Sequence, residues 1–288
     1  MSNQIFNRVV NVDGIRIFYR EAGDRKNPSV LLLPGFPTSS VMFKNLMTAL
    51  SYRLHLVAPD FPGFGFSDFP PKEQFEYTFR NISAYINKFT DEINLSSFTI
   101  YLHDYGAAVG LRLCVSHPEK IEGIIVQNGN AYEEGVRLIW DEMKEYWENP
   151  TPEKKEKLYA FLSEKGVKEQ YTAGLPEELK STISPELWVL DWGSMKRPGN
   201  INMQYELNCD YRNHMKMYPV YQEYFRAHRP PALVIWGKYD PFFNKEEAFC
   251  YKRDLPDAQI HMLKGSHWVL ETNFDEVLNL IHDFFKER

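Results

Sequence analysis

Three residues of this chain, Asp104, Asp240 and His267, have the types needed for nucleophilic catalysis. Together they could supply a nucleophile, a histidine that moves protons, and a carboxylate that orients the histidine. Such a set forms a covalent intermediate with the substrate and then releases it. The positions of the three residues along the chain indicate whether they can meet.

Each of these residues follows a segment that reads as a β-strand. Asp104 comes after residues 99–102, and the other two follow the runs "PPALVIWG" and "AQIHML". In an open parallel sheet, ligands meet the chain at the carboxyl ends of the strands, because loops and helix N-termini converge there. We therefore expect the three side chains at one edge of a sheet.

Strand-like and helical segments alternate through the first 127 residues. Apolar runs such as "SVLLLP" suit strands that are covered on both faces, and Ile82, Ile86, Phe89 and Ile93 share one face of a helix. Strands are predicted over residues 15–20, 30–33, 54–58, 99–102 and 121–127. The alternation predicts an α/β fold with a mostly parallel, doubly wound sheet.

The alternation stops after Asn130. Up to about Arg229 the chain is rich in aromatic and charged residues and in helical pieces punctuated by proline. Strand signals then return, and a last helix follows. Because the returning strands need the earlier sheet as a partner, we predict one core domain from residues 1–130 and 230–288. Residues 131–229 are predicted to form an inserted helical cap domain.

Composition excludes several classes of partner. The net charge of -6, with both signs interspersed, gives no basic stripe for nucleic acid or an anionic membrane. The first residues contain no cationic leader, and no segment approaches the roughly 18 apolar residues that span a bilayer, so we expect a cytoplasmic protein. The three cysteines are scattered and form no C-x-x-C pair, which argues against a disulfide framework and a zinc site.

Five motifs resemble those of the α/β-hydrolase superfamily. They are "LLLPGFPTSS", "APDFPGFGFSD", "HDYG", "GKYDPFF" and "GSHWVLE", and they span nearly the whole chain in strand context. Within the superfamily, the chain resembles the branch that uses aspartate as nucleophile, which contains epoxide hydrolases and haloalkane dehalogenases. The resemblance implies the α/β-hydrolase fold, with a helical cap inserted in the core.

The resemblance also assigns roles. In the order of this superfamily, Asp104 is the nucleophile, Asp240 the acid and His267 the histidine. The usual alternative position for the acid follows the sixth strand, and "VQNGN" has no carboxylate there. The nucleophile stands on a strained turn between a strand and a helix, and the backbone N–H groups of Phe36 and Tyr105 would form the oxyanion hole.

An aspartate nucleophile suits an electrophilic sp³ carbon. Its ordinary pKa of about 3.9 leaves it ionised at neutral pH, so it attacks without a general base. The product is an alkyl ester of Asp104. His267, oriented by Asp240, would activate water against the ester carbonyl while the oxyanion hole stabilises the tetrahedral charge. Neither a metal nor an organic cofactor is expected.

Three positions depart from the family pattern. Leu102 stands where a small residue is usual, which predicts a distorted elbow. Pro34 begins the oxyanion loop where the two subfamilies commonly have histidine, and Tyr105 replaces the usual tryptophan. Gly106 would permit close approach at the turn, and Pro37, which has no N–H, would shape the loop.

The leaving atom separates the two subfamilies. An epoxide oxygen must be protonated when it leaves, and related epoxide hydrolases supply this proton from two cap tyrosines. A departing halide needs only N–H donors. Tyr211 in "DYRN" resembles the second of these tyrosines, and Tyr146 is the candidate for the first. The chain lacks tryptophan after Asp104, and Phe36 stands where one dehalogenase subgroup would place asparagine. Possible halide donors remain in Trp140, Trp147, Trp188 and Trp192.

We therefore predict an epoxide hydrolase that acts on a small apolar electrophile and water. A haloalkane or haloacid dehalogenase is the alternative, followed by an ester or lactone hydrolase and by a scaffold that binds a ligand without turnover. The substrate is expected to contact Phe36, Pro37, His103, Trp140 and Trp147. A structural hydrogen-bonding role is the favoured interpretation of His103. A monomer or a homodimer is expected.

Overall fold

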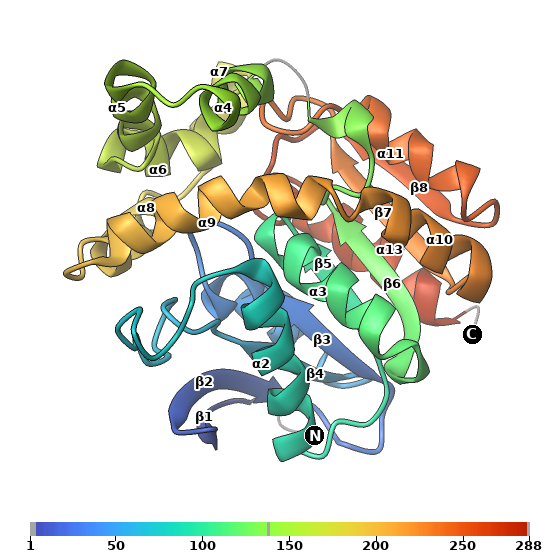
Figure 1. The fold of residues 1–288 in the computed structure, drawn as a ribbon. Coiled ribbons are helices and arrows are strands. Elements are labelled where there is room, and N and C mark those ends of the chain that lie inside the picture. The colour runs from blue at the N-terminus through green and yellow to red at the C-terminus, as the bar shows by residue number, and fades with distance from the viewer. Residues whose placement is uncertain (1–3, 137–138, 287–288) are drawn as a thin grey trace.

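The computed structural model describes residues 4–136 and 139–286 of the chain, and an eight-stranded sheet forms its centre (Figure 1). The strand order is β1-β2-β4-β3-β5-β6-β7-β8. β2 pairs antiparallel with both β1 and β4, and all other neighbours are parallel. The strands are β1 (Ile5–Val12), β2 (Ile15–Ala22), β3 (Ser29–Leu33), β4 (His55–Pro59), β5 (Phe98–His103), β6 (Ile121–Gln127), β7 (Ala232–Gly237) and β8 (Gln259–Leu263). The chain thus has the mostly parallel α/β fold that the sequence predicts.

Helices cover both faces of this sheet. On one face, alternate strand residues such as Leu31 and Ile100 pack with the buried side of α2 (Phe79–Glu92) and with α3 (Tyr105–Ser116). On the other face, Leu32 and Tyr101 pack with α1 (Lys44–Leu50) and α13 (Phe274–Lys286). Because both faces are buried, the central strands are apolar throughout, as parallel strands usually are. The sheet edge that carries the strand ends is thereby held rigid.

One strand is absent from the sequence prediction. β1 lies at the edge of the sheet, and most of its side chains are exposed. An edge strand with mostly exposed side chains can consist of polar residues. It therefore lacks the apolar run by which the other strands are predicted. The other predicted strands form close to the expected positions.

The chain between β6 and β7 is helical among the residues that the structure describes. In Figure 1, α4 to α7 gather at the top and α8 is seen at the level of α9, which runs between the upper helices and the helices α2 and α3. The helices are α4 (Ile139–Glu148), α5 (Pro152–Phe161), α6 (Glu164–Thr172), α7 (Glu177–Lys180), α8 (Glu186–Met195), α9 (Asn200–Met215) and α10 (Tyr218–His228). This α4–α10 segment corresponds to the predicted cap, which stays a proposal as a separate domain.

Short helices complete the loops. They are η1 (Ser40–Phe43), η2 (Pro118–Lys120), η3 (Glu133–Gly135), α11 (Glu246–Cys250), η4 (Tyr251–Arg253) and α12 (Val269–Thr272). Across residues 4–136 and 139–286, no helix combines the length and the apolarity needed to cross a bilayer.

Candidate active site

Asp104 stands on a strained turn between β5 and α3. Its backbone has φ 51° and ψ -118°, a left-handed conformation that is rare for a residue other than glycine. The turn also brings α3 against β3, since a Cβ at Gly106 would lie 2.3 Å from the carbonyl oxygen of Leu33. Only glycine tolerates this approach. The local sequence thus holds the Asp104 carboxylate at the end of the sheet.

Leu102 fits beside this turn because α3 carries a glycine opposite it. A Cβ at Gly110 would lie 2.2 Å from Cδ2 of Leu102, which is fully buried. The large side chain of Leu102 on β5 therefore fits into the space that Gly110 on α3 leaves free. The elbow keeps its strained backbone next to a leucine.

The loop after β3 supplies a hydrogen bond to Asp104. The backbone N–H of Phe36 donates to Oδ1 of Asp104 at 2.6 Å, and the next peptide bond, Phe36–Pro37, is cis. Tyr105 is the first residue of α3, so its N–H has no carbonyl partner within the helix. Both N–H groups thus belong to backbone that adjoins the Asp104 carboxyl group.

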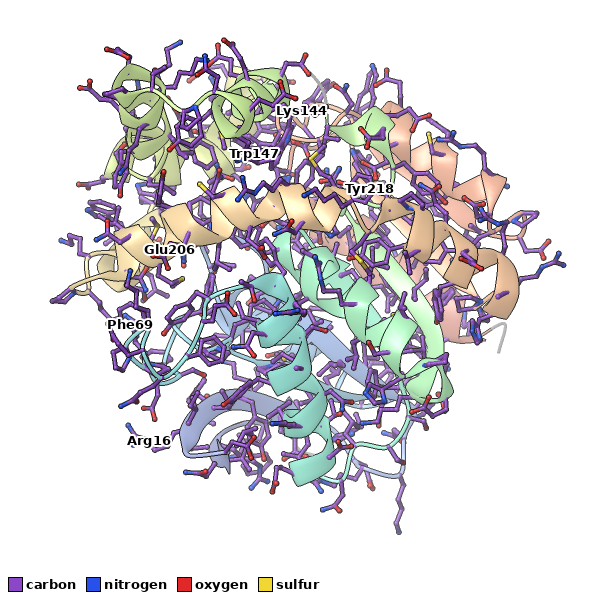
Figure 2. The ribbon with its side chains drawn as sticks, viewed as in Figure 1. Arg16, Phe69, Lys144, Trp147, Glu206 and Tyr218 are labelled. Atoms are coloured by element: carbon purple, nitrogen blue, oxygen red, sulfur yellow. The ribbon has the colours of Figure 1, made fainter. Side chains whose placement is uncertain are left out.

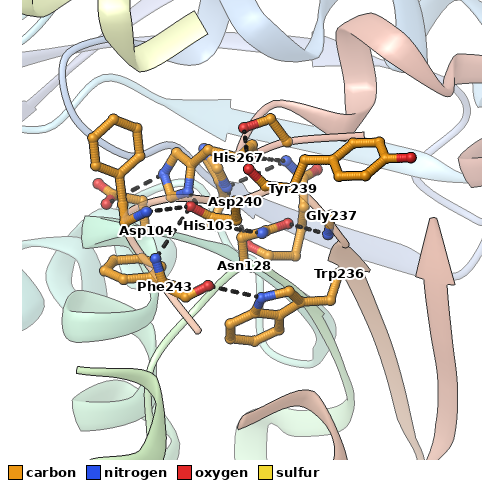
Figure 3. Close-up of polar contacts among 12 residues, drawn as sticks. His103, Asp104, Asn128, Trp236, Gly237, Tyr239, Asp240, Phe243 and His267 are labelled. Carbon is orange, nitrogen blue, oxygen red and sulfur yellow. Dashed lines mark hydrogen bonds and ion pairs between the residues drawn. The ribbon is translucent and has the colours of Figure 1, made fainter. Parts of the chain in front are cut away.

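His267 lies between two carboxylates (Figure 3). Its Nδ1 is 2.8 Å from Oδ2 of Asp240, and its Nε2 is 3.5 Å from Oδ2 of Asp104. Asp240 is itself fixed, since its Oδ1 accepts the N–H groups of Phe242 and Phe243 at 2.7 and 3.1 Å. The Asp240 side chain therefore holds one edge of the imidazole and leaves Nε2 directed toward Asp104.

Asn128 completes this arrangement. It occupies the position after β6 where the sequence offers no carboxylate, and its Nδ2 donates to Oδ2 of Asp240 at 2.6 Å. Its own Oδ1 accepts the N–H of Gly237 at 3.3 Å. The sequence prediction missed Asn128, although an amide at the carboxyl end of a central strand is a usable signal.

The charges of neighbouring groups shift the pKa values of both His267 and Asp104. Burial works against the imidazolium, but the carboxylates of Asp240 and Asp104 outweigh it and raise the pKa of His267 to about 9. Burial likewise opposes the Asp104 carboxylate, but His267 outweighs it and holds the pKa of Asp104 below its usual value. The free protein at neutral pH therefore carries a buried Asp104 carboxylate beside an imidazolium.

A cavity of about 280 Å³ lies between these core residues and the α4–α10 segment. Its charged lining residues pair across two helices, since Lys154 of α5 is 2.7 Å from Glu145 of α4, and Lys157 is 3.7 Å from Glu142. The other lining residues are mainly aromatic. The described residues that line the cavity are Phe36, Asp104, Tyr105, Trp140, Glu142, Met143, Glu145, Tyr146, Lys154, Lys157, Leu158, Phe161, Gln170, Asn208, Phe242 and Phe243. The nucleophile candidate thus faces a partly open and largely apolar cavity.

Two of the predicted residues of the α4–α10 segment line this cavity. Tyr146 does so, and its hydroxyl forms a hydrogen bond with the hydroxyl of Tyr205. Trp140 also lines it, but its Nε1 donates to the carbonyl oxygen of Phe242 at 2.9 Å. The indole N–H of Trp140 is therefore already occupied.

Tyr211 lies outside the lining of the cavity. It is fully buried, its ring stacks on Trp140 with centroids 4.4 Å apart, and its hydroxyl donates to Oδ1 of Asn130 at 2.7 Å. The resemblance of "DYRN" suggested a proton donor, but the hydrogen bond turns this hydroxyl toward the loop after β6. Tyr211 is corrected to a packing residue behind the wall of the cavity.

Three further predicted contacts also lie outside the lining. His103 is buried beneath His267 and Trp268, with Nδ1 donating to the carbonyl of Gln127 at 3.1 Å, which fits its structural interpretation. Trp147 lines a separate hollow between α4 and α9 (Figure 2). Pro37 is buried and is not among the lining residues. Conversely, Gln170 and Asn208 line the cavity and were not predicted, because nothing in a helical pattern marks them.

No group of three or more histidine, cysteine, aspartate or glutamate side chains in the described parts of the chain is arranged to hold a metal ion. The buried polar groups at the strand ends are instead arranged around Asp104 and His267. Their arrangement suits acyl or alkyl transfer to a carboxylate, followed by hydrolysis.

The comparisons with known proteins agree with this architecture. Residues 28–274 match the model of the alpha/beta hydrolase fold family. An uncharacterized hydrolase of Saccharomyces cerevisiae is 37% identical over the full length of both chains, and a haloalkane dehalogenase of Mycolicibacterium paratuberculosis is 31% identical over 40% of this chain and 38% of its own. Among solved structures, an epoxide hydrolase of Vigna radiata superimposes with a TM-score of 0.76 at 24% identity, covering both chains fully.

The sheet order and the strand ends define a hydrolase of the α/β class. The family match and the full-length relative make the assignment plain. The chain belongs to the alpha/beta hydrolase fold family.

Proposed function

We propose that this protein hydrolyses an epoxide to a diol through a covalent ester of Asp104. The observation that carries the proposal is the position of the Asp104 carboxylate. One carboxylate oxygen lies 2.6 Å from the N of Phe36 and the other 3.5 Å from Nε2 of His267, and the residue lines a largely aromatic cavity. A desolvated carboxylate next to an imidazolium suits attack on an uncharged electrophile.

The reaction has two stages. An Asp104 oxygen attacks an epoxide carbon, the bond from that carbon to the ring oxygen breaks, and the oxygen takes up a proton. The negative charge of Asp104 disappears when the ester forms, so one of the two charges that raise the His267 pKa is lost. A neutral His267 can then take a proton from water, and the hydroxide attacks the ester carbonyl.

The same geometry supports the second stage. The N–H of Phe36 already contacts one Asp104 oxygen, and it can donate to the oxyanion that forms when water attacks the ester. Asp240 stabilises the imidazolium that results, because it keeps its contact with Nδ1 throughout. Collapse of the tetrahedral intermediate returns the Asp104 carboxylate and releases the diol.

The cavity favours an epoxide over a halide. Of the six tryptophans, only Trp140 is among the lining residues, and its N–H is donated to Phe242. The lining includes two tyrosines instead, Tyr105 and Tyr146. A phenol can give a proton to a departing alkoxide, which an epoxide needs and a halide does not.

The test traps the intermediate. The variant His267→Gln lacks the base for the second stage, so we expect a stable mass increase on the peptide that contains Asp104 after incubation with a panel of small epoxides. The double variant Asp104→Ala with His267→Gln is the control and should gain no mass.

Other outcomes of the same experiment identify the alternatives. Free halide together with an alkylated Asp104 peptide, seen only with haloalkanes, would indicate a dehalogenase. An adduct with esters or lactones alone would indicate an acyl hydrolase. No adduct with any compound in either variant would contradict the proposal and would favour a scaffold that binds without turnover.

A further inference from the structure

Three residues that line the cavity carry buried polar atoms without a hydrogen-bond partner among the described residues. These atoms are the hydroxyl oxygen of Tyr105, Oδ1 of Asn208 and Nε2 of Gln170. The side chains are well buried, with Tyr105 4%, Asn208 6% and Gln170 2% exposed. Leaving such groups unpaired costs free energy, so their presence at a cavity indicates a ligand group that pairs with them.

The ring of Tyr105 is held by contacts that do not involve its hydroxyl. It packs against Phe36, Phe79 and Tyr211, with ring centroids 5.7, 4.8 and 6.1 Å away. These apolar contacts fix the direction of the hydroxyl and leave its hydrogen free to donate. The packing therefore fixes the ring of a residue that lines the cavity and leaves its hydroxyl without a partner.

The hydroxyl also lies within electrostatic reach of the nucleophile. Burial raises the pKa of Tyr105 well above its usual value, and the Asp104 charge raises it further, while the nearby Asn208 amide opposes the rise. The proton is consequently retained in the free protein. Tyr105 directly follows Asp104 in the chain, so the strained turn that sets the carboxylate also sets the start of this side chain.

Tyr146, the other tyrosine of the cavity lining, differs in one respect. Its hydroxyl is already paired with that of Tyr205. The Tyr105 hydroxyl has no partner in good hydrogen-bond geometry among the described residues, and Asn208 is the polar side chain close to it. A departing oxygen can therefore bind to Tyr105 without breaking an existing hydrogen bond.

We propose that the Tyr105 hydroxyl, with the Asn208 amide beside it, binds the oxygen that departs when the epoxide opens and gives that oxygen its proton. This assignment rests on the proposed function and makes Tyr105 a catalytic residue for the first stage. The substrate oxygen accepts from Tyr105, and the new alcohol can donate to Oδ1 of Asn208. Both unpaired atoms are satisfied in the ester intermediate.

The proton balance closes over one turnover. Asp104 forms a bond to carbon, the carbon–oxygen bond of the ring breaks, and the proton of Tyr105 moves to the oxygen and leaves a phenolate. The imidazolium of His267 then reprotonates the phenolate, directly or through water, and becomes the neutral base. Water restores the proton to His267 when the ester is hydrolysed, and Asp104 returns to its carboxylate form.

The experiment measures the first stage alone. Tyr105→Phe is introduced into the His267→Gln protein, and the growth of the Asp104 adduct is followed by rapid quenching and mass spectrometry with an epoxide that labels the parent. We expect alkylation to slow about 100-fold, the loss typical for removing one donor from a developing oxyanion. Tyr211→Phe, which removes the same atom from a neighbouring buried tyrosine, is the matched control and should alkylate at the parent rate.

Thermal unfolding separates catalysis from folding. Because the Tyr105 hydroxyl has no partner, Tyr105→Phe should unfold at the same temperature as the parent or higher, whereas a structural hydroxyl would lower it. Alkylation of Tyr105→Phe at the rate of the Tyr211→Phe control would overturn the Tyr105 assignment and leave the ester mechanism standing. No adduct in the His267→Gln parent with any epoxide would instead overturn the proposed function itself.

Discussion

The amide of Asn128 shows how one side chain replaces a charge at the strand ends. It donates to Asp240 at the point where related folds can place the acid itself. With an amide there, Asp240 receives donors on both of its oxygens and stays the single carboxylate behind His267. The identity of residue 128 therefore decides which strand carries the acid.

The substitution Asn128→Asp tests this role. A second carboxylate 2.6 Å from Asp240 would repel it, and one of the two pKa values would rise strongly. We expect turnover to fall at least about tenfold and the free energy of unfolding to fall by about 1–3 kcal/mol. Steady-state kinetics and urea unfolding measure both. Asn128→Ala removes the hydrogen bond without adding charge, so equal losses in the two variants would contradict the charge argument.

At the scale of elements, β5 and α3 form the support for the turn at Asp104. The helix packs close to the sheet because Gly106 presents no side chain to β3 and Gly110 presents none to β5. Gly110 makes room for Leu102 in particular. The strained backbone of Asp104 depends on this close packing, since a helix pushed away from the strand would change the angle of the turn.

The pair Leu102 and Gly110 gives a prediction for stability. In Gly110→Ala the new Cβ would lie 2.2 Å from Cδ2 of Leu102 and 2.9 Å from Cδ1 of Ile100, so side chains must shift, at a cost of about 1–3 kcal/mol. Leu102→Ala alone leaves a cavity and costs about 2–5 kcal/mol. The double variant should lose less than the sum of the two, because each change makes room for the other. Strictly additive losses in urea unfolding would show that the two residues are not coupled.

The elements differ in how far the sequence reveals them. Asp104, Asp240 and His267 could be found because each stands at or shortly after the end of a predicted strand, and topology alone brings strand ends together. The tyrosines could not be sorted in this way. On α4 and α9, a tyrosine that lines the cavity and one that packs behind it have the same helical surroundings, and the hydrogen bond from Tyr211 to Asn130 depends on how α9 lies over the core. Tertiary placement, which local pattern does not encode, decides these roles.

At the scale of the whole molecule, several buried groups hold protons more tightly in the folded state than in the unfolded one. Burial raises the pKa of Glu247 to about 8 and that of Asp191 to about 7, and the carboxylates beside His267 overcome its burial and raise its pKa to about 9. These groups lie in different parts of the structure. Their effects on stability therefore add.

The sign of the pH dependence follows from these shifts. Each folded pKa lies above its unfolded value, so the stabilisation is complete below the unfolded value and is lost as the pH rises through the folded one. We expect the unfolding temperature to fall as the pH rises from about 7 to about 9. Below pH 6.5 the trend is offset by His103 and His214, because burial lowers their pKa values and acid therefore favours the unfolded state. Calorimetry across this pH range measures the unfolding temperature. Asp191→Asn should make the curve flatter near pH 7, and a stability that rises between about pH 7 and 9 would contradict the prediction.

Trp140 joins two parts of the molecule that have separate tasks. Its ring forms a wall of the cavity, and its N–H holds the carbonyl of Phe242, whose own N–H holds Asp240. A molecule that displaces this indole would therefore also disturb the two consecutive hydrogen bonds that connect it to the Asp240 carboxylate.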